Sequence, residues 1–212
     1  MAFLNLEHSA RAYYADLVFY GAASMGLSLW LAWAVPPGQR LLGVLLFALG
    51  ALIWTLLEYL LHRFVLHGFD PFRRWHQMHH DRPAARICSP TVISASAFGL
   101  LVLLPSLAWL PTWQGLPLAS GVLSGLFVYS LAHHALHHHR PQRPWVRRYK
   151  LWHASHHLPG QHHRFGVTTF FWDGVWGTAG PALGPLKRQP CATTSRSAPA
   201  DASKTSHQGP SP

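Results

Sequence analysis

Acidic residues and cysteines are scarce in this 212-residue sequence, and each scarcity excludes a class of protein. The two cysteines, Cys88 and Cys191, are too few and too isolated for a disulfide framework or a thiolate metal site. Only 7 acidic residues oppose 17 lysines and arginines, so the formal net charge is +10. In a soluble protein that charge would indicate a nucleic-acid partner. Here the basic residues flank long apolar segments, as in membrane proteins, and we expect no nucleic-acid binding.

Apolar segments dominate the front of the chain, over residues 13–35, 41–61, 92–110 and 116–131. At about 1.5 Å per residue, helices of this kind can cross a hydrocarbon core of about 30 Å. The short turns PPGQR and PTWQG join the segments in pairs, which predicts two helical hairpins. A soluble protein with long core helices is the alternative, but the first two segments exceed the length of most core helices. The mean hydropathy of +0.09 hides this pattern because it averages an apolar front and a polar tail.

Basic residues gather on the side of the membrane away from the two turns, together with all the dense histidine groups. By the positive-inside tendency, this side is the cytoplasm. We therefore expect an all-α integral membrane protein with four transmembrane helices in two hairpins and a cytoplasmic, helical, histidine-rich metal-binding cap. The membrane would be a bacterial inner membrane or one of ER type. The basic residues are Arg63, Arg73, Arg74, Arg82, Arg86, Arg140, Arg143, Arg147, Arg148 and Lys150.

The same pattern divides the chain into three regions. Residues 1–11 form a short amphipathic, cytoplasmic N-terminal segment without the small-residue cleavage site that ends a signal peptide. Residues 12–186 form the membrane domain. Residues 187–212 are rich in Ser, Ala, Pro and Thr, so we expect a disordered C-terminal tail.

Histidine is over-represented, with 17 in the chain, and most of the histidines fall into the segments EYLLHRFVLH, WHQMHH, YSLAHHALHHH and WHASHH. On a helix, residues three and four apart share a face, so each HxxHH group presents three imidazoles to one side. His62 and His67 are five apart, and this spacing requires a helix break or places the two rings on different metals.

Clustered imidazoles indicate a metal site, because neutral imidazole binds iron, zinc, copper and nickel. About ten histidines suit two ions, since a single zinc hydrolase site uses about three protein ligands. A repetitive metal-sequestering tract fits less well with the aromatic, patterned surroundings of these groups. His8 and His207 are isolated surface residues, and His162 and His163 lack the spacing of the groups.

Carboxylates near the histidines are expected to balance the charge of two divalent ions and to orient the ligands through their free ring nitrogens. Glu58 lies four residues before His62. Asp81 directly follows His80, and Asp173 stands in the segment FFWDGVWGT. Glu58 is the strongest of these three candidates, because a carboxylate near the end of an apolar helix is costly without a function.

The order HxxxxH, HxxHH, HxxxH, HxxHH resembles the motifs of the fatty acid hydroxylase and sterol desaturase superfamily of membrane di-iron enzymes, over about residues 40–180. Here the motifs read HRFVLH, HQMHH, HHALH and HASHH. The stretch HHLPGQHHRFGVTTFFWDGVWGT resembles in particular the fatty acid and sphingolipid 2-hydroxylases. The resemblance implies ten metal ligands: His62, His67, His76, His79, His80, His133, His137, His153, His156 and His157.

The third motif has two possible registers, because His133 and His137 have the same spacing as His134 and His138. The first register is preferred, since it places Tyr129 four residues before the first ligand, where the superfamily often has a tyrosine. His134 and His138 are the second choice.

The resemblance also implies a reaction, with no catalytic residue beyond the ligands. Two iron ions, which zinc can replace, would activate O2 for hydroxylation of a lipid acyl chain, most specifically at C2 of a fatty acid. Electrons would come from a separate donor protein, either cytochrome b5-like or a ferredoxin with its reductase. A sterol or carotenoid desaturase or hydroxylase of the same superfamily is an alternative with the same ligands. Alternatives from other classes are a zinc-dependent membrane hydrolase and a metal-binding carrier, although nearly apolar helices count against a carrier.

Overall fold

The computed structural model describes residues 6–184, and helices form all their regular secondary structure apart from one isolated bridge between Glu7 and Ile87. The all-α prediction is therefore confirmed. The predicted tail, residues 187–212, and residues 1–5 of the predicted N-terminal segment lie outside the described residues.

Within the described part of the chain, four helical segments are long and apolar enough to cross a membrane, as the hydropathy pattern predicts. Two of them contain a π-helical turn, and the second begins with a short 3-10 turn, η2 (Pro37–Gln39). The segments are α1 (Ala10–Ala34); α2 (Arg40–Leu60) with the π-turn η3 (Leu61–Leu66); α4 (Thr91–Phe98), the π-turn η4 (Gly99–Leu103) and α5 (Leu104–Trp109); and α6 (Thr112–His138).

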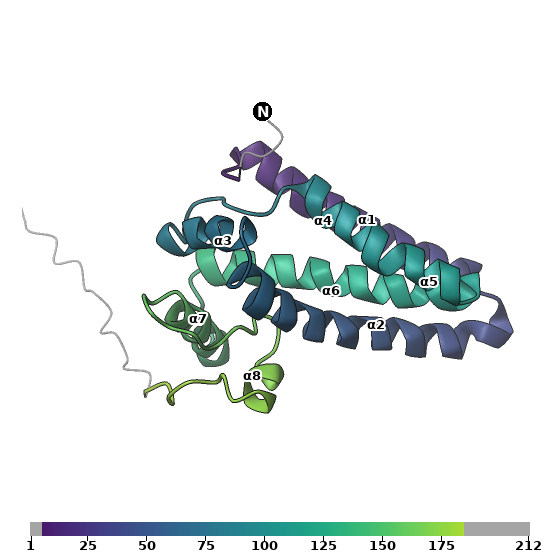
Figure 1. Ribbon diagram of the computed structural model, residues 1–212. Helices are drawn as coiled ribbons and strands as arrows, with labels where there is room; N and C mark the ends of the chain where they lie inside the picture. Colours follow the sequence, from purple (N-terminus) through teal and green to yellow (C-terminus); the bar gives the residue numbers. More distant parts are fainter. Residues whose placement is uncertain (1–5, 185–212) are drawn as a thin grey trace, which may run out of the picture.

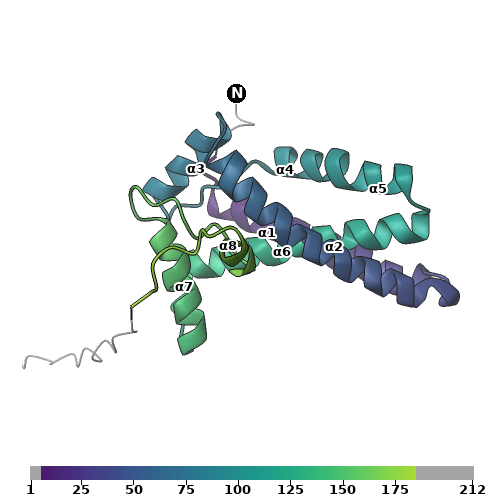
Figure 2. The same ribbon diagram turned by 60° about the horizontal axis from the view of Figure 1, so that its bottom comes forward.

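The central helix of the bundle is α6, which packs against α1, α2 and the segment from η4 to α5 (Figures 1 and 2). Its approach to α2 depends on glycine. A Cβ atom at Gly121 would lie 2.0 Å from the carbonyl oxygen of Phe47, and one at Gly50 would lie 2.1 Å from that of Leu118. The two backbones are therefore in near contact, as at other membrane helix interfaces built on small residues.

Three shorter helices gather beyond one end of this bundle (Figure 1). They are α3 (Phe72–Asp81), α7 (Pro144–His156) and α8 (Phe171–Val175). The ends of α2 and α6 reach the same region, and both carry histidine motifs. The two hairpins therefore bring all four motifs to one end of the bundle.

The π-turn η3 resolves the spacing of the first motif. In a π-turn the hydrogen bond joins residues five apart, so such residues lie one turn above each other. The rings of His62 and His67 accordingly face the same side, with centroids 5.2 Å apart. A distortion of the helix, and not a pair of separate metals, therefore accommodates the five-residue spacing.

Candidate dinuclear metal centre

Ten histidines converge into two groups of five, and in each group one ring nitrogen from every residue lies within 4.8 Å of all the others. We call these the first and second histidine groups. The first comprises His62, His67, His76, His80 and His156, and the second comprises His79, His133, His137, His153 and His157.

The first histidine group combines η3, α3 and α7. The Nε2 atom of His76 lies 3.0 Å from that of His62 and 3.1 Å from that of His80. The Nε2 atoms of His67 and His156 are 3.1 Å apart. The neighbouring elements η3 and α3 and the distant helix α7 thus direct the same ring atom toward one point.

The second histidine group combines α3, the end of α6 and α7. The Nε2 atom of His137 lies 3.2 Å from that of His133 and 2.8 Å from that of His153. The Nε2 atoms of His153 and His157 are 3.2 Å apart. Both groups draw on α3 and α7, because each HxxHH motif divides its three histidines between the two groups.

These spacings fit two metal ions. Two nitrogens that bind one ion at about 2.1 Å and at a right angle lie about 3.0 Å apart. Burial lowers the pKa of His79 to about 3 and that of His156 to about 4, so both rings are neutral at physiological pH, as ligation requires. The Nε2 atom of His79 is buried and has no hydrogen-bond partner among the described residues, which suits a metal ligand.

A loop, residues 163–168, contacts the first histidine group through its backbone. The Nδ1 atom of His62 lies 2.5 Å from the carbonyl oxygen of Phe165, and the Nδ1 atom of His156 lies 2.8 Å from that of His163. Between these two carbonyls, Arg164 has a φ of 64°, in the left-handed region that few residues other than glycine adopt. This reversal accompanies the approach of both carbonyls to the rings.

Two of the predicted carboxylates hold this loop and do not contact the rings directly. Glu58 accepts hydrogen bonds from the backbone nitrogens of Val167 at 2.6 Å and Thr168 at 2.9 Å, and from the hydroxyl of Thr168. Asp173 accepts from the backbone nitrogens of Phe165 and Gly166, both at 2.9 Å. Both carboxylates therefore bind the backbone of the loop whose carbonyl oxygens face His62 and His156.

Residues 47–178 match a family model described as fatty acid hydroxylase. The chain belongs to the fatty acid hydroxylase family. It is 36% identical over 148 residues to the dihydroceramide fatty acyl 2-hydroxylase FAH2 of Arabidopsis thaliana, covering 63% of this chain and 60% of the relative. It is 32% identical over 156 residues to the fatty acid 2-hydroxylase of Homo sapiens, covering 68% of this chain and 42% of the relative. The chain thus spans about half the length of these relatives.

A solved structure confirms the fold of the family. The chain matches a structure entitled "Full length scs7p (only hydroxylase domain visible)" with a TM-score of 0.69 and 27% identity. The match covers 82% of this chain and 70% of the other. The resemblance drawn from the motifs, to the fatty acid hydroxylases and their 2-hydroxylase branch, is therefore confirmed.

The remaining predicted residues lie outside the two groups. His134 faces α1, where its Nδ1 atom is 3.1 Å from the hydroxyl oxygen of Tyr13, and the ring of His138 lies beside it at 4.7 Å. Asp81 is exposed at the end of α3 and accepts a hydrogen bond from Gln77. His163 contributes its carbonyl oxygen to His156. Sequence reasoning singled out the FGVT segment by resemblance but missed the backbone role of the loop that contains it.

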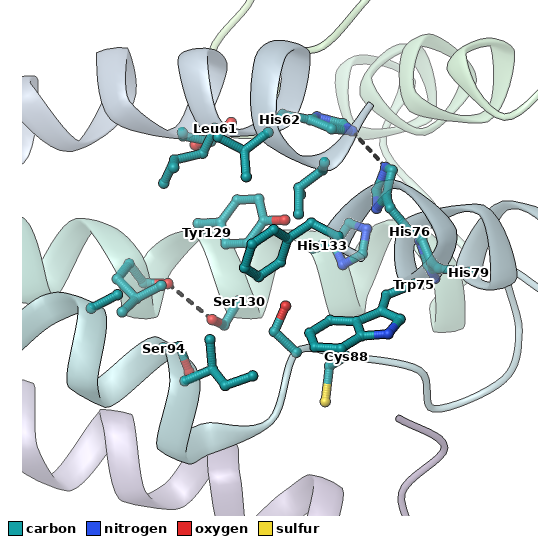
Figure 3. Close-up of a pocket in the computed structure, with 18 of the residues that line it drawn as sticks. Leu61, His62, Trp75, His76, His79, Cys88, Ser94, Tyr129, Ser130 and His133 are labelled. Atoms are coloured by element: carbon teal, nitrogen blue, oxygen red, sulfur yellow. Dashed lines mark hydrogen bonds between the residues drawn. The ribbon is translucent and has the colours of Figure 1, made fainter. Parts of the chain in front are cut away.

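A pocket of about 490 Å³ connects the histidines with the interior of the helix bundle (Figure 3). Its walls come mainly from α1, α2 with η3, α3, α4 and α6, and they are mostly apolar. Histidines of both groups line it, His62 and His76 from the first and His79 and His133 from the second. This volume falls in the range of about 300–1,000 Å³ that is common for small-molecule sites.

Polar groups also line this pocket, where α1 meets α4. The hydroxyl oxygen of Tyr20 lies 2.7 Å from that of Ser94. Asp16 accepts a hydrogen bond from the hydroxyl of Thr91 at 2.6 Å. Most of the polar atoms in these side chains are thus paired within the protein, which leaves an apolar space leading to the histidines.

Proposed function

We propose that this protein is a membrane di-iron oxygenase that hydroxylates a lipid acyl chain, at C2 of a fatty acid, with O2 and external electrons. The observation that carries the proposal is the apolar pocket lined by histidines of both groups. An acyl chain in that pocket has its carbon atoms beside both metal positions. The two relatives described above bear the names of fatty acyl and fatty acid 2-hydroxylases, which supports the choice of substrate class and carbon.

The ten histidines of the two groups would hold the metal, with Nε2 as the ligand atom where these atoms converge. Bound iron would supply O2 activation and oxidation of an unactivated C–H bond. The chain's own residues bind and orient the acyl chain along α4 and α6 and exclude water from it. Glu58 and Asp173 orient ligands through the 163–168 loop.

The site would lie at the cytoplasmic face of the membrane. The helices α3 and α7, which carry several basic residues, lie at the end of the bundle that α2 and α6 reach with their histidine motifs, and such residues favour the cytoplasm. The substrate would enter from the bilayer as a membrane lipid or fatty acid. A separate electron donor, cytochrome b5-like or a ferredoxin with its reductase, would deliver electrons from the cytoplasm.

The test is lipid profiling of cells that express the intact protein or a His153→Ala variant, with O2 and a competent reductase present. We expect 2-hydroxylated fatty acyl chains with the intact protein and none above background with the variant. Absence of any oxygenated lipid with the intact protein would overturn the proposal. Metal analysis of the purified protein is a weaker test, because zinc can replace iron at imidazole sites.

The same experiment separates the alternatives. An oxygenated or desaturated sterol or carotenoid would indicate another reaction of the same superfamily. A product that forms without O2 or reductant would indicate a zinc-dependent hydrolase. Retention of metal without any product would favour a carrier.

A further inference from the structure

We propose that the two metal positions differ in how firmly they hold their ions, and that the first histidine group holds its ion more firmly. This inference rests on the two-metal site of the proposed function. Its basis is a difference in hydrogen bonding: backbone carbonyls contact rings of the first group, whereas buried Nδ1 atoms in the second group have no partner in the described part of the chain. The two groups have the same number of histidines but different surroundings.

The first histidine group has two rings oriented by protein carbonyls. His62 and His156 each place Nδ1 within hydrogen-bond distance of the 163–168 loop, at 2.5 and 2.8 Å. A ring that donates from Nδ1 keeps the Nε2 lone pair available for metal, in a fixed orientation and with increased basicity. Both rings are also buried, so water competes little for these bonds.

The loop that supplies these carbonyls is anchored at both of its ends. Glu58 on α2 binds the backbone of Val167 and Thr168, and Asp173 on α8 binds that of Phe165. Arg164 donates to the carbonyl oxygen of Ala179 at 3.0 Å and also to the hydroxyl of Ser155. The orientation of the first group is therefore fixed by α2, α7 and α8 together.

In the second histidine group, two buried rings have no such carbonyl partner among residues 6–184. The Nδ1 atoms of His79 and His153 are buried there without a hydrogen-bond partner in the protein. Packing orients these rings instead: the ring of His79 lies 4.8 Å from that of His133 and 4.6 Å from that of His137. Because partners beyond the ligands contribute about 10–100-fold in metal affinity, the second group should bind its ion less firmly by a factor of that order.

The first experiment is a chelator titration of the intact protein in detergent after it has been loaded with Zn²⁺, with the metal content measured by elemental analysis. We expect two steps of one ion per chain, separated by about 10–100-fold in free chelator. Thr168→Val removes the hydroxyl that donates to Glu58, and it should bring the two steps together. Thr112→Val is the matched control, because Thr112 begins α6 at the end of this helix away from its histidines. It should leave both steps unchanged.

A second experiment assigns the steps to the groups through two matched double variants. His133→Ala with His137→Ala removes two ligands from the second group, and His76→Ala with His80→Ala removes two from the first; each pair is four residues apart on one helix. The ion left in the first variant should resist chelator more strongly than the ion left in the second. Adding Thr168→Val should weaken retention in the first variant alone.

Each outcome supports or overturns the inference. A single two-ion step in the intact protein, the reverse order of retention, or an equal effect of Thr168→Val on both double variants would overturn it and leave the proposed function intact. If the intact protein cannot be loaded with two ions per chain, the two-metal site of the proposed function fails as well. If a double variant does not fold, the inference is still tested by the first experiment, which asks whether the intact protein shows two steps and whether they merge in Thr168→Val.

Discussion

The hydroxyl oxygen of Tyr13 on α1 lies 3.1 Å from the Nδ1 atom of His134 on α6. His134 therefore faces α1, while His133, one residue earlier, faces the second histidine group. The ring of His138 lies beside that of His134 on the same outer side, with centroids 4.7 Å apart. This placement favours His133 and His137 as the ligands of the third motif.

The register can be tested by alanine substitution at all four positions. We expect His133→Ala and His137→Ala to weaken metal binding in the second group and to reduce product by more than about 100-fold, because direct ligands matter more than their outer partners. His134→Ala and His138→Ala should retain two ions per chain and most activity. Elemental analysis and lipid profiling measure both quantities, and loss of an ion from His134→Ala would reverse the assignment.

The helices and the clustering of the histidine motifs were predictable from the sequence because both depend on local periodicity. The helices α1, α2 and α4 begin within three residues of the expected starts of the first three membrane segments. The fourth was predicted at residues 116–131, whereas α6 covers Thr112–His138. The C-terminal end differs because histidines end an apolar run but do not end a helix. Hydropathy therefore marks the edge of the membrane and not the C-terminal end of α6.

The support of the ligands was not predictable, since it depends on backbone atoms and long-range contacts. Every residue has a backbone carbonyl, so the identity of Phe165 does not predict the contact of its carbonyl oxygen with His62. Glu58 was expected to act on imidazole directly, but a backbone segment more than 100 residues later lies between them. The left-handed backbone conformation of Arg164, with a φ of 64°, likewise cannot be predicted from its residue type.

Glycine at the interface of α2 and α6 provides a test of the bundle. Gly121→Ala would place a Cβ atom 2.0 Å from the carbonyl oxygen of Phe47, so the helices must separate. We expect a loss of about 1–3 kcal/mol in stability, measured as a lower thermal unfolding temperature in detergent. Gly26→Ala in α1 is the matched control, because no heavy atom lies within 4 Å of the added Cβ there. Equal effects of the two substitutions would contradict the close approach.

Arg164→Lys should destabilise the region around the first histidine group. The guanidinium of Arg164 is buried, lies 4.9 Å from the ring of Trp152, and donates to Ser155 and two backbone carbonyls. A lysine has a single nitrogen and cannot reproduce this planar set of contacts, so we expect a loss of about 2–3 kcal/mol. Arg148→Lys, at an exposed position of α7, should change the unfolding temperature little. A neutral Arg164→Lys would show that these contacts contribute little.

Cys88 should resist alkylation in the folded protein. Burial raises the pKa of its thiol to about 12, and the thiolate is the reactive form. At pH 8 the folded protein therefore carries about a thousandfold less thiolate than an ordinary cysteine with a pKa near 9, and the fraction rises as the pH approaches 12. In a Cys191→Ser background, iodoacetamide should react slowly at pH 8 and tenfold faster with each added pH unit. The protein unfolded in detergent at pH 8 is the control, and similar rates in both states would contradict the prediction.

The wall of the pocket formed by α4 should determine which acyl chains fit. Ala97 lines the pocket between Ile93 and Leu101, so Ala97→Phe places a ring in the space that an acyl chain would occupy. We expect at least about tenfold less product from long chains and a relative shift toward shorter ones, because even single methylene differences in a hydrophobic pocket change selectivity by about that factor. Leu100→Phe is the matched control, since Leu100 is 63% exposed and does not line the pocket. Competition between acyl chains of different length, with the products separated by mass, measures the shift. An unchanged chain-length profile in Ala97→Phe would mean that the substrate reaches the histidines by a route other than this pocket.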